Sequence, residues 1–184
     1  MVVPMRSLIV EDNPVNQLFL KRILSKYGDC DAHANALDGI KTFTRALDSG
    51  DPFHLVCLDV SMEGLDGVNA LKRIRAIEAE RGVFRHDCVR IFMVTSIGDE
   101  HVVKSAVTLS DAYLLKPIDH KILVGTLRKL RLIDAPSNCI EEFESMCNED
   151  QIPQADLARL ATVIQKSMDR QSKCHEESAV AVES

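Results

Sequence analysis

Five polar side chains directly follow short apolar runs in this sequence, and their types suit phosphoryl transfer. They are Glu11, Asp12, Asp59, Thr95 and Lys116. The three carboxylates offer the oxygen ligands that Mg²⁺ or Mn²⁺ prefers. A carboxylate such as Asp59 can also attack phosphorus once a cation screens the incoming charge. The lysine would pair with Asp59 at rest and with a phosphoryl oxygen afterwards, and the threonine hydroxyl would donate to another phosphoryl oxygen.

Each of these residues also has an ordinary structural explanation. Glu11 and Asp12 stand before a predicted helix, so capping that helix and serving a site have equal weight for this pair. Lys116 on its own would be a solvated surface lysine, and Thr95 a residue that fills a strand end. The shared position after a strand favours chemistry. Crowded carboxylates raise one another's pKa, and a divalent cation would relieve that repulsion.

The spacing of apolar residues predicts five strands that alternate with five helices. The strands cover residues 7–10, 30–34, 55–58, 89–94 and 112–115. The helices cover residues 14–27, 37–47, 67–80, 99–109 and 118–133. This alternation implies a parallel sheet with helices on both faces and right-handed crossovers. Because ligands of such sheets bind at the carboxyl ends of the strands, the five side chains should converge there.

Two local details accompany this pattern. Asn13 and Pro14 stand where a helix N-cap and a first helical residue are expected. In the helix of residues 67–80, the apolar stripe leaves Arg75 on the solvent side, together with Lys72 and Arg73.

Composition limits the classes of function. The chain has 184 residues and a net charge of −6, which argues against nonspecific binding to nucleic acid. It shows no signal peptide and no apolar run near the ~18 residues of a membrane span, so we expect a soluble cytoplasmic protein. Its six cysteines have no C-x-x-C spacing, which favours free thiols over disulfides or zinc ligands.

The last fifty residues differ in character from the rest. We divide the chain into a domain of residues 1–134 and a C-terminal extension of residues 135–184, which begins with a linker. Apolar residues between 157 and 168 predict one short helix, and residues 171–184 are polar and expected to be disordered. This extension is too short for a usual DNA-binding domain and has no basic recognition helix. Docking on the first domain and mediating a homodimer both remain open for it.

Four groups of residues together resemble the receiver domain of two-component response regulators. They are Val-Glu-Asp-Asn-Pro-Val-Asn at 10–16, Leu-Asp-Val-Ser-Met at 58–62 with Leu-Asp-Gly at 65–67, Val-Thr-Ser at 94–96, and Tyr-Leu-Leu-Lys-Pro at 113–117. The resemblance covers about residues 5–133. It implies a flavodoxin-like (βα)5 fold, a doubly wound parallel sheet with strand order 2-1-3-4-5.

The resemblance also implies a reaction. A histidine kinase or a histidine phosphotransfer protein would pass a phosphoryl group from its phosphohistidine to Asp59, with Mg²⁺ or Mn²⁺ bound. The metal ligands implied are Glu11, Asp12, Asp59 and the backbone carbonyl of Ser61. Thr95 and Lys116 would hold the phosphoryl group. Tyr113 would be the rotameric switch residue coupled to Thr95, although an ordinary half-buried strand tyrosine is the simpler explanation without the family.

Three positions depart from the family pattern. Glu63 stands where proline usually follows the methionine, Leu109 where a glycine usually precedes the fifth strand, and Ser96 where alanine is usual. The segment between Asp59 and Thr95 also looks long. None of these changes removes a reacting group, so we expect phosphorylation with an altered rate of dephosphorylation.

Several functions are compatible with these motifs. The first is a stand-alone receiver that signals through contacts with a downstream protein and does not act as a turnover enzyme. The second is a receiver module from a hybrid kinase or a longer regulator. A haloacid-dehalogenase-type phosphatase also uses an aspartate nucleophile, Mg²⁺ and a lysine, but that family has a second aspartate where Ser61 stands here. A receiver that is no longer phosphorylated is a further alternative, and the retained Asp59 and Lys116 argue against it.

Overall fold

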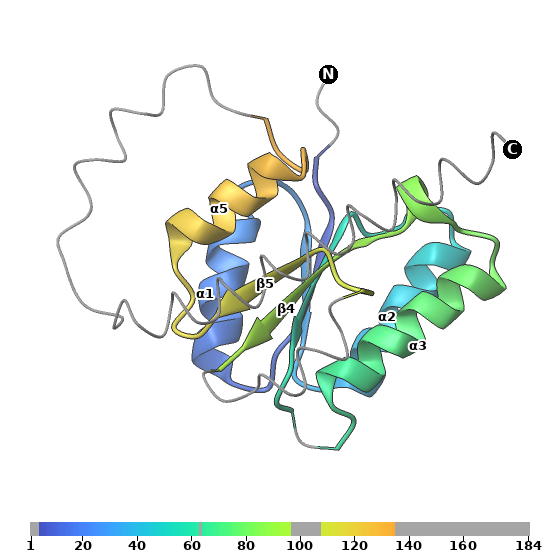
Figure 1. The fold of residues 1–184 in the computed structure, drawn as a ribbon, viewed down its shortest axis with the longest axis horizontal. Helices are drawn as coiled ribbons and strands as arrows, with labels where there is room; N and C mark the ends of the chain where they lie inside the picture. The colour runs from blue at the N-terminus through green and yellow to red at the C-terminus, as the bar shows by residue number, and fades with distance from the viewer. Residues whose placement is uncertain (1–3, 63, 97–107, 135–184) are drawn as a thin grey trace, which may run out of the picture. The chain divides into compact units, whose positions relative to one another are not determined.

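The computed structural model describes residues 4–62, 64–96 and 108–134, which lie within one compact unit, Met1–Ala135. Five parallel strands form one sheet in the order β2-β1-β3-β4-β5 (Figure 1). Their bounds are β1 Ser7–Val10, β2 Cys30–His33, β3 Leu55–Asp59, β4 Arg90–Thr95 and β5 Ala112–Leu115. The predicted fold class and strand order are therefore confirmed.

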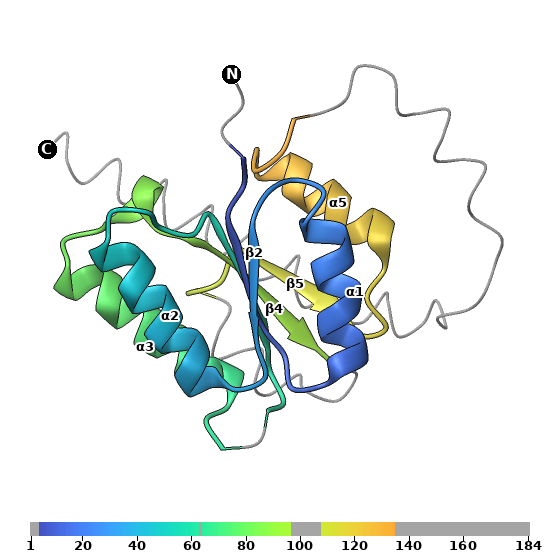
Figure 2. The same cartoon turned by 180° about the vertical axis from the view of Figure 1, so that it is seen from behind.

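Helices cover both faces of this sheet. Their bounds are α1 Pro14–Leu24, α2 Ala36–Asp48, α3 Gly67–Glu80 and α5 His120–Lys129, with a short 3-10 helix η1 at Arg85–Asp87. Figure 2 shows α1 and α5 together on one side of the strands and α2 and α3 side by side on the other. Among the described residues, none of these helices is long and apolar enough to span a membrane.

The two layers of helices enclose two separate hydrophobic clusters. Successive residues of a strand point to opposite faces, and β3 shows this directly. Its Val56 and Leu58 belong to the cluster under α2 and α3, while Leu55 and Cys57 belong to the cluster under α1 and α5. All four of these side chains are fully buried. The continuous apolar run at 55–58 is thus the signature of a central parallel strand.

Polar caps determine where the helices begin. Asn13 has extended backbone angles, and its side chain accepts from the N–H groups of Val15 and Asn16 at 2.9 and 3.2 Å, so the predicted N-cap is confirmed. Asp66 caps α3 in the same way, with Asn69 N–H at 2.8 Å. These caps satisfy backbone donors that the first turn leaves without helical partners.

The predicted helix of residues 118–133 is longer than α5 at both ends. Asp119 caps the helix from an extended conformation, which places Pro117 and Ile118 before it. At the other end Arg131 has φ of 57°, a left-handed conformation that stops an α-helix.

Some predictions fall outside the described residues. These are most of the helix predicted for residues 99–109, the position Glu63, and the C-terminal extension with its short helix. The prediction that Arg75 faces solvent was wrong, because its side chain is only 19% exposed and contacts the residue before β4 and the segment before β5. The cysteines Cys30, Cys57 and Cys88 have free thiols, as predicted.

Candidate functional site

Lys116 joins two strand-end carboxylates at the carboxyl edge of the sheet. Its Nζ donates to Asp59 Oδ2 at 2.8 Å and to Glu11 Oε1 at 3.0 Å. Glu11 and Asp59 are each 1% exposed, and the lysine side chain is 18% exposed. The last residue of β3, the residue after β1 and the residue after β5 are thus brought into direct contact, as the positions in the sequence predict.

Burial and charge shift the titration of two of these groups. Burial raises the pKa of Glu11, the hydrogen bond from Lys116 partly offsets this rise, and the charge of Asp59 adds to it. Burial alone would lower the pKa of Lys116, but its hydrogen bonds to Asp59 and Glu11 outweigh this effect and raise it. Lys116 is therefore a full cation at neutral pH, opposite in charge to the carboxylates that it contacts.

The acids at this edge outnumber the lysine that they contact. One carboxylate oxygen from each of Glu11, Asp12 and Asp59 lies within 4.8 Å of the other two. The second carboxylate oxygen of Glu11, Oε2, is buried without a hydrogen-bond partner among the described residues. Asp12 is exposed, so this group of oxygens is open to solvent on one side. A hard divalent cation such as Mg²⁺ fits this set of oxygen donors, because it takes carboxylates on one side and retains water on the other.

The first turn of α1 holds Glu11 in place. Asn16 Nδ2 donates to Glu11 Oε1 at 3.2 Å, the Asn13 N–H donates to the same oxygen at 3.3 Å, and Gln17 Nε2 donates to the Glu11 carbonyl at 3.1 Å. Asn16 and Gln17 were not predicted as site residues. The available signal was two amides on the first turn of a helix that directly follows an acid pair.

The loop between β3 and α3 folds back onto Asp59. The Gly67 N–H donates to the Val60 carbonyl at 3.1 Å, and the Ser61 N–H donates to Asp59 Oδ1 at 3.2 Å. A Cβ at position 67 would collide with the Asp59 carbonyl oxygen, so this close approach requires glycine. The structure therefore explains why the Leu-Asp-Gly motif has glycine at position 67. The Ser61 carbonyl as a metal ligand stays a prediction.

Thr95 and Tyr113 lie on one face of the sheet. The register pairs Tyr113 with Met93, two residues before Thr95, so both side chains project toward α2 and α3. Thr95 is 1% exposed, and Lys116 N–H donates to its carbonyl at 2.8 Å. Tyr113 is half-buried and its hydroxyl accepts from Ser110 Oγ at 2.8 Å. Burial raises the pKa of this tyrosine, which keeps it protonated.

The Lys116–Pro117 peptide bond is cis. Two of the positions that depart from the family pattern are described by the structure. Ser96 is exposed, and Leu109 is partly buried against the α2 and α3 cluster.

A parallel sheet in this order, with acids and a lysine meeting at its carboxyl edge, defines the class of receiver domains. The family model of the response regulator receiver domain matches residues 7–128. The chain belongs to this family, which serves two-component and phosphorelay signalling. The comparison does not favour the phosphatase alternative.

Individual relatives agree with this family. The sensor protein GacS of Pseudomonas syringae pv. syringae is 34% identical over 125 residues, covering 67% of this chain and 13% of GacS. The chemotaxis protein CheY of Treponema pallidum is 28% identical over 121 residues, covering 64% of this chain and 76% of CheY. The chain thus spans a small part of the first relative and most of the second.

A solved complex provides a structural neighbour. It is the co-crystal structure of the Saccharomyces cerevisiae histidine phosphotransfer signaling protein Ypd1 and the receiver domain of its downstream response regulator Ssk1. This neighbour is 25% identical, with a TM-score of 0.59, and the match covers 76% of this chain and 97% of the neighbour.

Proposed function

We propose that Asp59 accepts a phosphoryl group from the phosphohistidine of a histidine kinase or a histidine phosphotransfer protein. The observation that carries this proposal is the buried contact of Lys116 with both Asp59 and Glu11. A lysine fixed 2.8 Å from a carboxylate in a cluster of three acids is suited to exchange that carboxylate for a phosphoryl oxygen. A surface lysine at a strand end would have no such pair of buried partners.

These contacts support the following chemical step. An oxygen of Asp59 forms the new O–P bond while the P–N bond to the donor imidazole breaks. The imidazole keeps the electron pair of that bond and takes up a proton. Lys116 and the hydroxyl of Thr95 would then hold phosphoryl oxygens, in the roles that the family implies.

Glu11, Asp12, Asp59 and the Ser61 carbonyl would hold Mg²⁺ or Mn²⁺. The bound cation would neutralise part of the negative charge that the carboxylates and the phosphoryl group bring together. The buried Oε2 of Glu11, which has no hydrogen-bond partner in the described part of the chain, supports this assignment because a cation would give it one.

The output would be a conformational change and not the turnover of a substrate. The new charge at Asp59, roughly −1.5 to −2 by analogy with other phosphorylated side chains, would attract Thr95 and vacate space for Tyr113. Both residues lie on the same face of the sheet, which supports this coupling. A downstream protein would then recognise the altered surface, and we expect the protein to act in the cytoplasm.

The relatives leave two settings for this module. CheY supports a receiver that is most of its own chain, and GacS supports a receiver within a longer sensor protein. The Ypd1–Ssk1 complex supports a histidine phosphotransfer protein as the phosphoryl donor.

Incubation with radiolabelled acetyl phosphate and Mg²⁺ tests the proposal. We expect wild type to take up at most one acid-labile phosphoryl group per chain, and Asp59→Asn to take up none. Asp48→Asn is the matched control, because Asp48 is an exposed carboxylate paired with Arg81 far from this cluster. Equal labelling of Asp59→Asn and wild type would refute the assignment, and sustained release of phosphate from a phosphomonoester would favour the phosphatase.

A further inference from the structure

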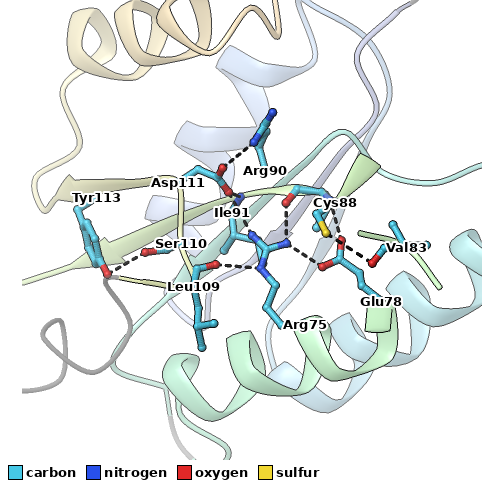
Figure 3. Close-up of polar contacts among 11 residues, drawn as sticks. Arg75, Glu78, Val83, Cys88, Arg90, Ile91, Leu109, Ser110, Asp111 and Tyr113 are labelled. Carbon is cyan, nitrogen blue, oxygen red and sulfur yellow. Dashed lines mark hydrogen bonds and ion pairs between the residues drawn. The ribbon is translucent and has the colours of Figure 1, made fainter. Parts of the chain in front are cut away.

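A second cluster of charges lies beside the switch tyrosine and has no role in the chemistry described above. It joins α3 to β4 and to the segment before β5, and Figure 3 shows its members pointing toward one another. We call it the Arg75 network and define it by its four charged residues, Arg75, Glu78, Arg90 and Asp111. Two cations and two anions make it neutral as a whole.

Arg75 makes contacts in several directions at once. Its Nη1 donates to Glu78 Oε2 at 2.7 Å and to the Val89 carbonyl at 2.9 Å. Its Nε donates to the Leu109 carbonyl at 2.9 Å, and its Nη2 donates to Asp111 Oδ2 at 3.2 Å. The planar guanidinium is the side chain that can fill such a set of acceptors, and lysine has no equivalent geometry.

The two carboxylates of the network are equally well bound. Glu78, whose side chain is 3% exposed, also accepts from the Val89 N–H at 2.7 Å. Asp111 also accepts from Arg90 Nη1 at 3.0 Å and from the Ile91 N–H at 2.8 Å. Buried charges are costly unless they are paired and hydrogen-bonded. Here both conditions are met, which offsets the cost of burying these charges.

This arrangement fixes the residues on both sides of Ser110. Arg75 binds the carbonyl of Leu109 and the carboxylate of Asp111, which are the two chain neighbours of that serine. The Asp111 N–H also donates to the Ile91 carbonyl at 2.8 Å. Ser110 Oγ in turn donates to the Tyr113 hydroxyl at 2.8 Å. A continuous set of contacts therefore runs from α3 to the tyrosine.

We propose that Arg75 is a positioning residue for the Tyr113 switch. By holding residues 109–111, it stabilises the rotamer in which the tyrosine hydroxyl binds Ser110. The functional part of this inference rests on the proposed role of Tyr113, and the positioning part does not. Loss of Arg75 should release that rotamer and shift the receiver toward its activated state. A ligand that prefers the activated state should then bind more tightly.

The two tyrosines of the chain, Tyr27 and Tyr113, allow a direct measurement. Protein labelled with 3-fluorotyrosine gives two ¹⁹F NMR signals, and Tyr113→Phe assigns them. We expect Arg75→Lys to shift the Tyr113 signal of the unliganded protein and to leave the Tyr27 signal in place. Ser110→Ala, which leaves the Arg75 network intact, should shift the Tyr113 signal as well.

The matched control is Arg73→Lys, because Arg73 lies two residues away on α3 with its side chain 55% exposed and paired with Glu80. This change should move neither signal. Since Arg75→Lys keeps the charge opposite Glu78, it avoids an uncompensated buried carboxylate. If the Tyr113 signal of Arg75→Lys equals that of wild type, the inference is wrong. If Arg75→Lys shifts the signals of both tyrosines alike, Arg75 has a general structural role and the inference is also wrong.

Titration with beryllofluoride and Mg²⁺ separates this inference from the proposed function. In wild type the titration should move the Tyr113 signal, and in Arg75→Lys the midpoint should fall about 2- to 10-fold. If the wild-type Tyr113 signal does not change during the titration, the switch role of Tyr113 is contradicted. The spectra of the unliganded proteins still decide whether Arg75 positions Tyr113. A midpoint that Arg75→Lys leaves unchanged would overturn the coupling.

Discussion

Replacing Lys116 with methionine removes the ammonium that bridges Glu11 and Asp59 and retains most of the volume of the side chain. Each bridge is short, at 3.0 and 2.8 Å, and each carboxylate is 1% exposed. At an effective dielectric constant of about 20, one such contact is an attraction on the order of 5 kcal/mol. The cost of removing three charged groups from water offsets much of that attraction.

The variant still has the cost of removing the two carboxylates from water, but it lacks the Lys116 ammonium that compensates for it. Two buried carboxylates would then face each other across the site, and breaking a buried ion pair of this kind costs about 3–5 kcal/mol of unfolding free energy. With a urea m-value of about 2 kcal/mol/M, the unfolding midpoint in EDTA should fall by roughly 2 M. Mg²⁺ at about 100 times its dissociation constant would raise the unfolding free energy by about 2.7 kcal/mol, because it binds only the folded protein.

Urea unfolding in EDTA and in excess Mg²⁺ measures both effects. Far-UV circular dichroism is the suitable signal because the chain has no tryptophan. The control is Lys129→Met at the exposed end of α5, which should stay within about 0.5 kcal/mol of wild type. If both variants unfold at the same urea concentration in EDTA, the buried bridge does not stabilise the fold and the electrostatic reasoning fails.

Two further predictions concern the loops and caps around the site. Gly67→Ala should lower the unfolding free energy by about 1–3 kcal/mol, because its Cβ would overlap the Asp59 carbonyl. The control is Gly125→Ala in α5, which has open space around its Cβ and should raise the unfolding free energy by about 0.5–1 kcal/mol. Equal effects of the two changes in urea unfolding would contradict the close approach at Gly67. Asn13→Ala removes the cap of α1 and should cost about 1 kcal/mol by the same measurement, and a neutral result would show that its two hydrogen bonds are replaced by water.

The sequence predicted the elements that are bounded by continuous apolar runs. The run at Leu55–Leu58 and the strands β1 and β5 were placed within one residue, and α3 was placed at both ends. The strands β1 and β3 are buried on both faces and α3 starts at a recognisable cap, so local pattern and tertiary position agree there. The helix α5 was predicted too long because the cap at Asp119 and the left-handed Arg131 were not recognised.

The site was predicted less completely than the fold. The contact of Lys116 with Glu11 and Asp59 followed from the rule that parallel strands end at one edge. The Arg75 network could not be found in this way, because Arg75 and Glu78 are three residues apart on a helix and look like an exposed ion pair. The other acceptors of Arg75 lie up to 36 residues away, and only the folded chain brings them together.

The acid cluster draws on both helical layers. Glu11 is hydrogen-bonded to the first turn of α1, which packs on one side of the strands. The Asp59 carbonyl lies close against the first residue of α3, which packs on the other side. Any ion or group seated between these acids would therefore touch elements that support both helical layers. Local opening of either layer would release it, so occupancy at a single point should slow amide exchange throughout both.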